Sequence, residues 1–118
     1  MQDLKHKLKI LQNIGVASVF DDTLALASIA SRQKKCRVLD LGTGTGYIAI
    51  YLAKLGFAAD GADINQTAIK VARINARKNH VRCRFFVSDL FSTVKKKYGM
   101  IVFNPPLGNE KGLKPMEG

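Results

Sequence analysis

The sequence has no apolar run that approaches the roughly 18 residues of a membrane span, and it has few cysteines and few acidic residues. Residues 1–7 also lack the apolar stretch and the small-residue cleavage site of a secretory signal. These absences argue against a membrane protein. We therefore expect a cytoplasmic location and no membrane partner.

Cysteine is scarce, with Cys36 and Cys83 as the two instances. Two isolated cysteines do not have the spacing of metal ligands, so no metal site is expected. Both fall in segments that we expect to be buried strands. Buried free thiols are therefore favoured over a disulfide.

Acidic residues are outnumbered: Asp plus Glu total 9 and Lys plus Arg total 19, which gives a formal net charge of +10. A positive field attracts polyanions, so the charge favours a nucleic-acid or ribosomal partner. No aromatic residues are interleaved in the basic clusters to stack on bases. A protein with a basic surface and no such partner is the alternative.

The length of 118 residues, with 47% apolar residues, predicts one small domain. Residues 1–35 are expected to form two helices that precede the core. The first, over residues 4–14, ends at Gly15, and the second, over residues 23–31, is capped by Asp21 or Asp22.

Strands and helices then alternate. We expect strands over 36–41, 57–63, 82–87 and 100–103, helices over 47–55 and 66–79, and a loop over 88–98. Asn65 is expected to cap the second of these helices. Such alternation predicts an α/β fold with a parallel, Rossmann-like sheet over residues 36–107, and a C-terminal tail over 108–118. The ligand site of such a sheet lies at the carboxyl ends of its strands.

A glycine-rich turn follows the first strand, with Asp40 before it and the sequence Gly42-Thr43-Gly44-Thr45-Gly46 within it. Glycines let the backbone approach a ligand, and free amides at the start of a helix favour a negative group. The dinucleotide spacing G-x-G-x-x-G fails here, so a ligand without a pyrophosphate is favoured. Asp40 is then expected to face a cationic amino group.

Two more aspartates follow the second and third strands. Asp63 is placed to accept both hydroxyls of a ribose; its alternative role, capping the next helix, is already served by Asn65. Asp89 is placed to accept from an exocyclic amino group such as that of adenine, with Ile64 and Leu90 flanking the ring. The alternative for Asp89 is an exposed turn residue.

The fourth strand runs into Asn104-Pro105-Pro106-Leu107. Two prolines remove two N–H donors, so the polar groups that remain are mainly acceptors: the Asn104 side-chain oxygen and the Pro105 carbonyl. This suits an –NH2 group whose hydrogens must be held. A plain strand-ending turn is the alternative.

Together these segments resemble class I S-adenosylmethionine (SAM)-dependent methyltransferases, over roughly residues 15–109. The matching segments are 38–47, 62–65, 88–91 and the Asn-Pro-Pro segment 101–107. The nearest groups are the small methyltransferases and the HemK-like glutamine methyltransferases. In HemK-like members a Glu/Asp-Asp-Thr/Ser-Leu segment precedes the first motif, and Phe20–Leu24 resembles this segment.

The resemblance implies a doubly wound class I methyltransferase sheet, cut short after strand four, with SAM as the cofactor. It assigns the methionine part of SAM to Asp40 and residues 42–46, the ribose to Asp63, and the adenine to Asp89 and Leu90. It assigns the orientation of the acceptor nitrogen to Asn104 and Pro105. The implied activity is methylation of a planar nitrogen in a macromolecule: a protein glutamine in the translation machinery, or adenine or guanine in RNA or DNA.

Three departures from the family pattern stand out. Leu107 replaces the usual aromatic residue, Gly99 replaces a common aspartate, and the family's further strands are absent. The fourth strand would then be an open edge, which favours a homodimer or a partner chain. A non-catalytic SAM-binding module completed by a partner is the alternative function. A nucleotide-dependent oxidoreductase is disfavoured by the glycine spacing.

Overall fold

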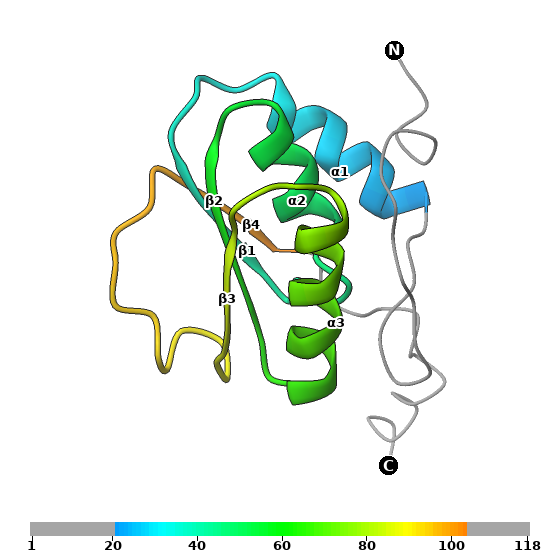
Figure 1. Cartoon of the computed structure of the whole chain (residues 1–118). Coiled ribbons are helices and arrows are strands. Elements are labelled where there is room, and N and C mark those ends of the chain that lie inside the picture. The colour runs from blue at the N-terminus through cyan, green and yellow to red at the C-terminus, as the bar shows by residue number, and fades with distance from the viewer. Residues whose placement is uncertain (1–20, 104–118) are drawn as a thin grey trace.

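Residues 21–103 are the part of the chain that the computed structural model describes (Figure 1). The expected helix over 4–14, the Asn104-Pro105-Pro106-Leu107 segment and the tail over 108–118 lie outside the described residues. Between these limits, every expected strand and helix is present. The elements in chain order are α1 (Asp21–Ser31), β1 (Arg37–Leu41), α2 (Tyr47–Lys54), β2 (Ala58–Asp63), α3 (Gln66–Lys78), β3 (Arg84–Val87) and β4 (Met100–Phe103).

Local sequence explains where the helices begin and end. The Asn65 side chain accepts from the amides of Thr67 and Ala68, which confirms the predicted cap of α3. α2 stops before Gly56, whose φ of +102° is a conformation that glycine adopts readily. α1 begins at Asp21, two residues before the expected start.

The four strands form one parallel sheet in the order β3-β2-β1-β4. The chain moves outward from β1 to β3 and then returns to pair β4 with the other side of β1. This reversal confirms the doubly wound order, with the switch point between β1 and β4. The carboxyl ends of β1 and β4 therefore flank this switch point, and the carboxyl end of β2 lies on the other side of β1.

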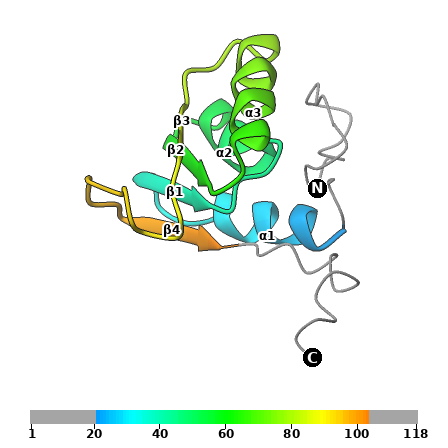
Figure 2. The ribbon, with the colours of Figure 1, turned by 90° about the horizontal axis from the view of Figure 1, so that it is seen from below.

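All three helices cover one face of the sheet (Figure 2). The core on this face is built from small residues of the helices and larger ones such as Val38, Ile50, Leu52 and Phe85. The connection from β3 to β4 has no helix. Its residues Val94 and Tyr98 pack on the opposite face of the sheet. Within the described residues, this loop is what covers the second face.

A buried aspartate in the middle of β2 anchors that loop. The Tyr98 hydroxyl donates to Asp60 Oδ2 at 2.7 Å, and Arg84 lies 3.7 Å from the same oxygen. Burial, together with this bond, raises the pKa of Tyr98. The sequence pattern did not indicate Asp60, because its partner Tyr98 is 38 residues away.

Contrary to the prediction from the sequence, the two cysteines do not lie within strands. Cys36 and Cys83 are free and half-buried, and each lies one residue before a strand instead of within it. Burial raises the pKa of the Cys83 thiol to about 12, with further contributions from Asp60 and Asp40. Cys83 packs against the core with its Sγ 3.7 Å from the Ala49 carbonyl, and its burial disfavours the thiolate form. In residues 21–103, no helix is both long and apolar enough to span a membrane.

Replacing Tyr98 with phenylalanine removes the hydroxyl donor to Asp60 and leaves a buried carboxylate with one fewer partner. We expect the free energy of unfolding to fall by about 1–2 kcal/mol in urea denaturation. Tyr51→Phe is the matched control, because no hydrogen bond of the Tyr51 hydroxyl is seen within residues 21–103. Equal stability of the two variants would show that the Tyr98 hydroxyl does not hold the loop.

Candidate cofactor site at the carboxyl ends of the strands

The Asp63 carboxylate joins the glycine-rich loop to the end of β2. Asp63 Oδ2 accepts from the Gly44 amide at 2.8 Å, and Oδ1 accepts from the Asn65 amide at 2.9 Å. The amides of Gly42 and Thr43 donate to the Ala62 carbonyl at 2.8 and 2.9 Å. The structure thus brings together two of the predicted site segments, the loop and Asp63. Gly44 and Asp63 are 19 residues apart in the sequence.

Close packing explains why the loop ends in glycine. Gly46 has a φ of +88°, and a Cβ atom there would lie 3.0 Å from the Ala72 Cβ and 3.1 Å from the Phe85 ring. Any larger residue would be strained in conformation and crowded by α3 and β3. The loop is therefore held tightly against the layer beneath it.

A residue that the sequence did not indicate supports the loop from below. Asn75 of α3 is 0% exposed, and its Nδ2 donates to the Thr45 carbonyl at 2.9 Å. Asn79 Nδ2 in turn donates to the Asn75 carbonyl at 2.8 Å. One clue was available: an asparagine on the otherwise apolar face of a helix needs a buried partner.

Asp40 lies beneath the loop instead of on its surface. It is 1% exposed, and its Oδ2 accepts from the Thr43 hydroxyl at 2.7 Å. Its other oxygen, Oδ1, is buried and makes no hydrogen bond within the described residues. A buried acceptor of this kind attracts a proton or a cation.

The pKa of Asp40 reflects this burial. The pKa of Asp40 is raised from 3.8 to about 7, mainly by desolvation and to a smaller extent by the nearby Asp63 carboxylate. The Thr43 hydroxyl and the Ala49 backbone amide oppose the shift. Asp40 is therefore poised between its neutral and ionised forms near neutral pH.

The third strand end supplies an exposed, mostly apolar rim. The Ser88 amide donates to the Asp63 carbonyl at 3.0 Å, so this turn lies beside Asp63. Asp89 is exposed, as are Ile64 (64%) and Leu90 (56%). The three predicted adenine-site residues thus follow two adjacent strands and face solvent.

Leu90 has a φ of +55°, which is uncommon for a residue other than glycine. The Ser88 hydroxyl donates to the Leu90 carbonyl at 2.7 Å and accepts from the Thr93 amide at 3.1 Å. Strained conformations held in this way occur often at binding sites. The Ser88 contacts were not indicated by the sequence.

The comparisons with known proteins agree with this geometry. A family model described as the methyltransferase small domain matches residues 8–116. The chain belongs to this methyltransferase family. The resemblance to class I methyltransferases is therefore confirmed, while the roles of the individual site residues stay predictions.

The names of the relatives of this chain give two kinds of methyl acceptor, a protein glutamine and ribosomal RNA. A release factor glutamine methyltransferase of Buchnera aphidicola is 45% identical over 80 residues, covering 65% of this chain and 29% of that protein. A ribosomal RNA small subunit methyltransferase C of Alcanivorax borkumensis is 31% identical over 78 residues, covering 66% of this chain and 24% of that protein. The chain therefore spans less than a third of the length of these two relatives.

A solved structure shares the fold. The tRNA (uracil-54, C5)-methyltransferase of Pyrococcus abyssi, solved in complex with S-adenosyl-L-homocysteine, has a TM-score of 0.63 and 31% identity. The match covers 80% of this chain and 28% of that chain. The parallel sheet described above is thus the sheet of a methyltransferase.

Asp40 predicts a distinctive pH dependence of stability. Its folded pKa of about 7 exceeds the reference value of 3.8, so the folded state binds a proton that the unfolded state has lost. This contribution to the free energy of unfolding is fully present below pH 4 and is lost as the pH rises to about 7, by roughly 4 kcal/mol.

Asp40→Asn keeps an acceptor for the Thr43 hydroxyl and removes the titration. In urea denaturation at pH 4 to 8, the difference in stability between this variant and the parent chain should grow with pH, in favour of the variant. Parallel profiles would contradict the raised pKa.

Asn75→Ala removes the donor to the Thr45 carbonyl and leaves that acceptor unpaired in the core. We expect a loss of about 2–3 kcal/mol in the free energy of unfolding. Lys70→Ala, at an exposed position of the same helix, is the matched control and should change it by less than about 0.5 kcal/mol. If both variants unfold alike, Asn75 does not support the loop.

Proposed function

We propose that the chain binds S-adenosylmethionine at the loop of residues 42–46 and serves the transfer of its methyl group to a planar nitrogen of a macromolecule. The observation that carries the proposal is the bond between the Gly44 amide and the Asp63 carboxylate. It brings a glycine-rich loop and a ribose-type acidic residue to one place. A cytoplasmic location is part of the same proposal.

The residues present fit the parts of this cofactor. Each carboxylate oxygen of Asp63 accepts one backbone amide and retains a second lone pair for a ribose hydroxyl. Ile64 and Leu90 offer apolar surface for a ring, and Asp89 offers an acceptor for an exocyclic amine. The start of α2 favours a carboxylate near the loop.

Asp40 would act from beneath the loop. Its buried Oδ1 lacks a hydrogen bond within the described residues, so a cationic amino group above the loop would favour its ionised form. Asp40 therefore supports binding through the Thr43 hydroxyl and through its charge. In this role Asp40 does not need to touch the ligand, because it is buried beneath the loop.

The bound cofactor would supply a methyl group on a positively charged sulfur, which is already an activated leaving group. The chain then needs to position a nucleophile in line and to hold its hydrogens. By sequence, Asn104 and Pro105 provide acceptors for an –NH2 group, and Pro106 and Leu107 shape the same segment. A delocalised nitrogen loses its proton after transfer, so no dedicated base is needed.

The names of two relatives support two kinds of acceptor, a protein glutamine and ribosomal RNA. The side-chain amide of glutamine and the exocyclic amine of a base are both planar nitrogens of the kind that the Asn-Pro-Pro segment suits. The alternative is a non-catalytic SAM-binding module completed by a partner chain. Its support is the β4 edge, where Ile101 and Phe103 are half-exposed and no further strand pairs within the described residues.

Pairing of the β4 edge with a second copy or a partner chain is the assembly that we propose for this alternative. Sedimentation of the purified chain tests the dimer, because an unpaired edge invites association. We expect a dimer, and we expect substitutions within β4 (Met100–Phe103) to dissociate it. A monodisperse monomer at all concentrations would exclude the homodimer.

The cofactor proposal is tested by calorimetric titration of the chain with SAM, S-adenosylhomocysteine and NAD. We expect SAM and S-adenosylhomocysteine to bind and NAD not to bind. Asp63→Asn should weaken SAM binding by at least about tenfold, the loss expected when hydrogen bonds to a charged group are removed. Asp60→Asn, on the same strand but on its other face, should retain the affinity.

The transfer step is tested with labelled SAM against a glutamine-containing peptide and a ribosomal RNA fragment. Asn104→Ala should bind SAM normally and lose transfer. An unchanged transfer rate would remove Asn104 from the proposal, and absence of SAM binding by the parent chain would remove the proposal as a whole.

A further inference from the structure

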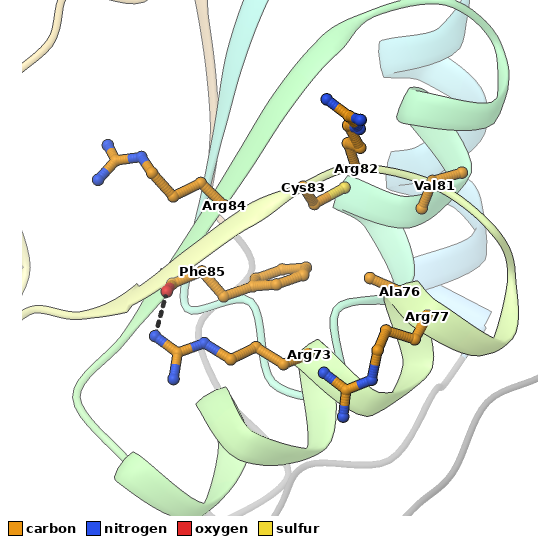
Figure 3. Close-up of a pocket in the computed structure, with 8 residues that line it drawn as sticks. All are labelled: Arg73, Ala76, Arg77, Val81, Arg82, Cys83, Arg84 and Phe85. Atoms are coloured by element: carbon orange, nitrogen blue, oxygen red, sulfur yellow. Dashed lines mark hydrogen bonds between the residues drawn. The ribbon is translucent and has the colours of Figure 1, made fainter.

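The two ends of β3 carry different features. Near its amino end, Arg73 of α3 donates from Nη2 to the Phe85 carbonyl at 2.9 Å, beside an open pocket (Figure 3). At its carboxyl end, the chain forms a hydrogen-bonded turn over residues 88–93, which we call the Ser88 turn. The Ser88 turn lies at the end of the sheet that carries the candidate cofactor site, whereas the pocket does not.

Ser88 makes the central hydrogen bonds of this turn. It is buried, with 3% of its surface exposed, and its hydroxyl donates to the Leu90 carbonyl at 2.7 Å and accepts from the Thr93 amide at 3.1 Å. The Ser88 amide donates to the Asp63 carbonyl at 3.0 Å. Ser88 therefore connects the turn to the residue that is proposed to bind the ribose.

The turn fixes the backbone of Asp89 and leaves its side chain available. The Asp89 amide donates to the Ser92 hydroxyl oxygen at 3.1 Å, and the Ser92 amide donates to the Asp89 carbonyl at 3.0 Å. The Asp89 carboxylate makes no hydrogen bond or ion pair within residues 21–103. Its position is thus set by the turn, and its oxygens can accept from a ligand.

Leu90 is an unusual residue for its place in this turn. Its φ of +55° strains any residue that has a Cβ atom, whereas glycine adopts this conformation readily. Leu90 also leaves 56% of its surface exposed. A turn that only had to redirect the chain would be more stable with glycine there. The strain and the exposure together indicate that the leucine side chain serves a contact that the described residues do not supply.

We propose that Ser88 is a positioning residue for recognition of the cofactor's base, because its hydroxyl holds Leu90 and Asp89 in place beside Asp63. The inference rests on the proposed function, in which Leu90 and Asp89 bind the adenine. Ser88 is buried and acts through these neighbours. Without its hydroxyl, the Leu90 carbonyl and the Thr93 amide lose their partner, and Leu90 can relax to a negative φ.

The chemistry that this turn would recognise is a planar base with an exocyclic amino group. Ile64 and Leu90 follow the adjacent strands β2 and β3 and offer exposed apolar surface to a ring. An ionised carboxylate accepts hydrogen bonds and donates none, so Asp89 favours an amino group over a carbonyl at the same position of the base. Displacement of the turn should therefore reduce selectivity for the base as well as affinity.

The test compares S-adenosylhomocysteine with S-inosylhomocysteine, in which a carbonyl replaces the amino group, by calorimetric titration of the full chain. The parent chain should bind the adenosyl ligand at least about tenfold more tightly, the loss expected for a hydrogen bond to a charged group. Ser88→Ala should weaken binding of the adenosyl ligand about five- to tenfold and reduce the ratio of the two affinities by a similar factor. A variant that is only less stable would weaken both ligands alike and keep the ratio.

Thr93→Val is the matched control. It removes a hydroxyl of the same turn, which donates to the Val87 carbonyl at 2.8 Å, and it keeps the amide that donates to Ser88. This variant should retain the affinity and the ratio. Ser88→Thr, which keeps a hydroxyl at position 88, should restore the ratio that Ser88→Ala loses.

An unchanged ratio in Ser88→Ala, or an equal fall of the ratio in Thr93→Val, would overturn the proposal. If Ser88→Ala does not fold, as judged by circular dichroism, Ser88→Cys replaces it with a weaker donor of similar shape, and the same fall is expected. A parent chain that binds both ligands equally would overturn this inference and leave the cofactor proposal standing. A parent chain that binds neither ligand would remove both.

Discussion

The Asp63 carboxylate is the interaction on which the candidate site depends. Its two oxygens hold the glycine-rich loop and the start of α3, and the Asp63 carbonyl accepts from Ser88 at the end of β3. One residue therefore fixes three segments that are far apart in the chain. Because these segments are the carboxyl ends of adjacent parallel strands, fixing them also shapes the surface where such sheets bind ligands.

The layer below this surface contains polar groups that a purely structural core would avoid. Asn75 is fully buried and donates to the Thr45 carbonyl, and Asp40 is buried with a raised pKa and has one oxygen without a hydrogen bond within residues 21–103. Buried polar groups of this kind reduce stability unless they are satisfied. Asn75 is satisfied by the Thr45 carbonyl, whereas the desolvation of Asp40 is a cost to the stability of the ionised form that the proposed cationic group of the ligand would offset.

Much of the fold could be predicted from the sequence, because short-range patterns determine it. Hydrophobic runs and helical periodicity located the strands and helices, and Asn65 was identified as a cap from its position alone. Asp60 and Asn75 were missed, since their partners are 38 and 30 residues away. Arg73 and Arg82 appeared as scattered basic residues, and only the packing of α3 against β3 placed both beside one pocket. Of the site, the order of the segments was predictable, whereas the burial of Asp40 was not.

The central claim is that ligand binding occurs at the loop that Asp63 holds. Backbone amide chemical shifts of the ¹⁵N-labelled chain, followed during titration with SAM, test this claim residue by residue. The account predicts that the largest changes occur at Gly42, Gly44 and Gly46 and at the neighbouring amides of Ile64 and Leu90, with little change at Arg77 and Arg82. Absence of changes at the loop, or changes concentrated at Arg77 and Arg82, would contradict it.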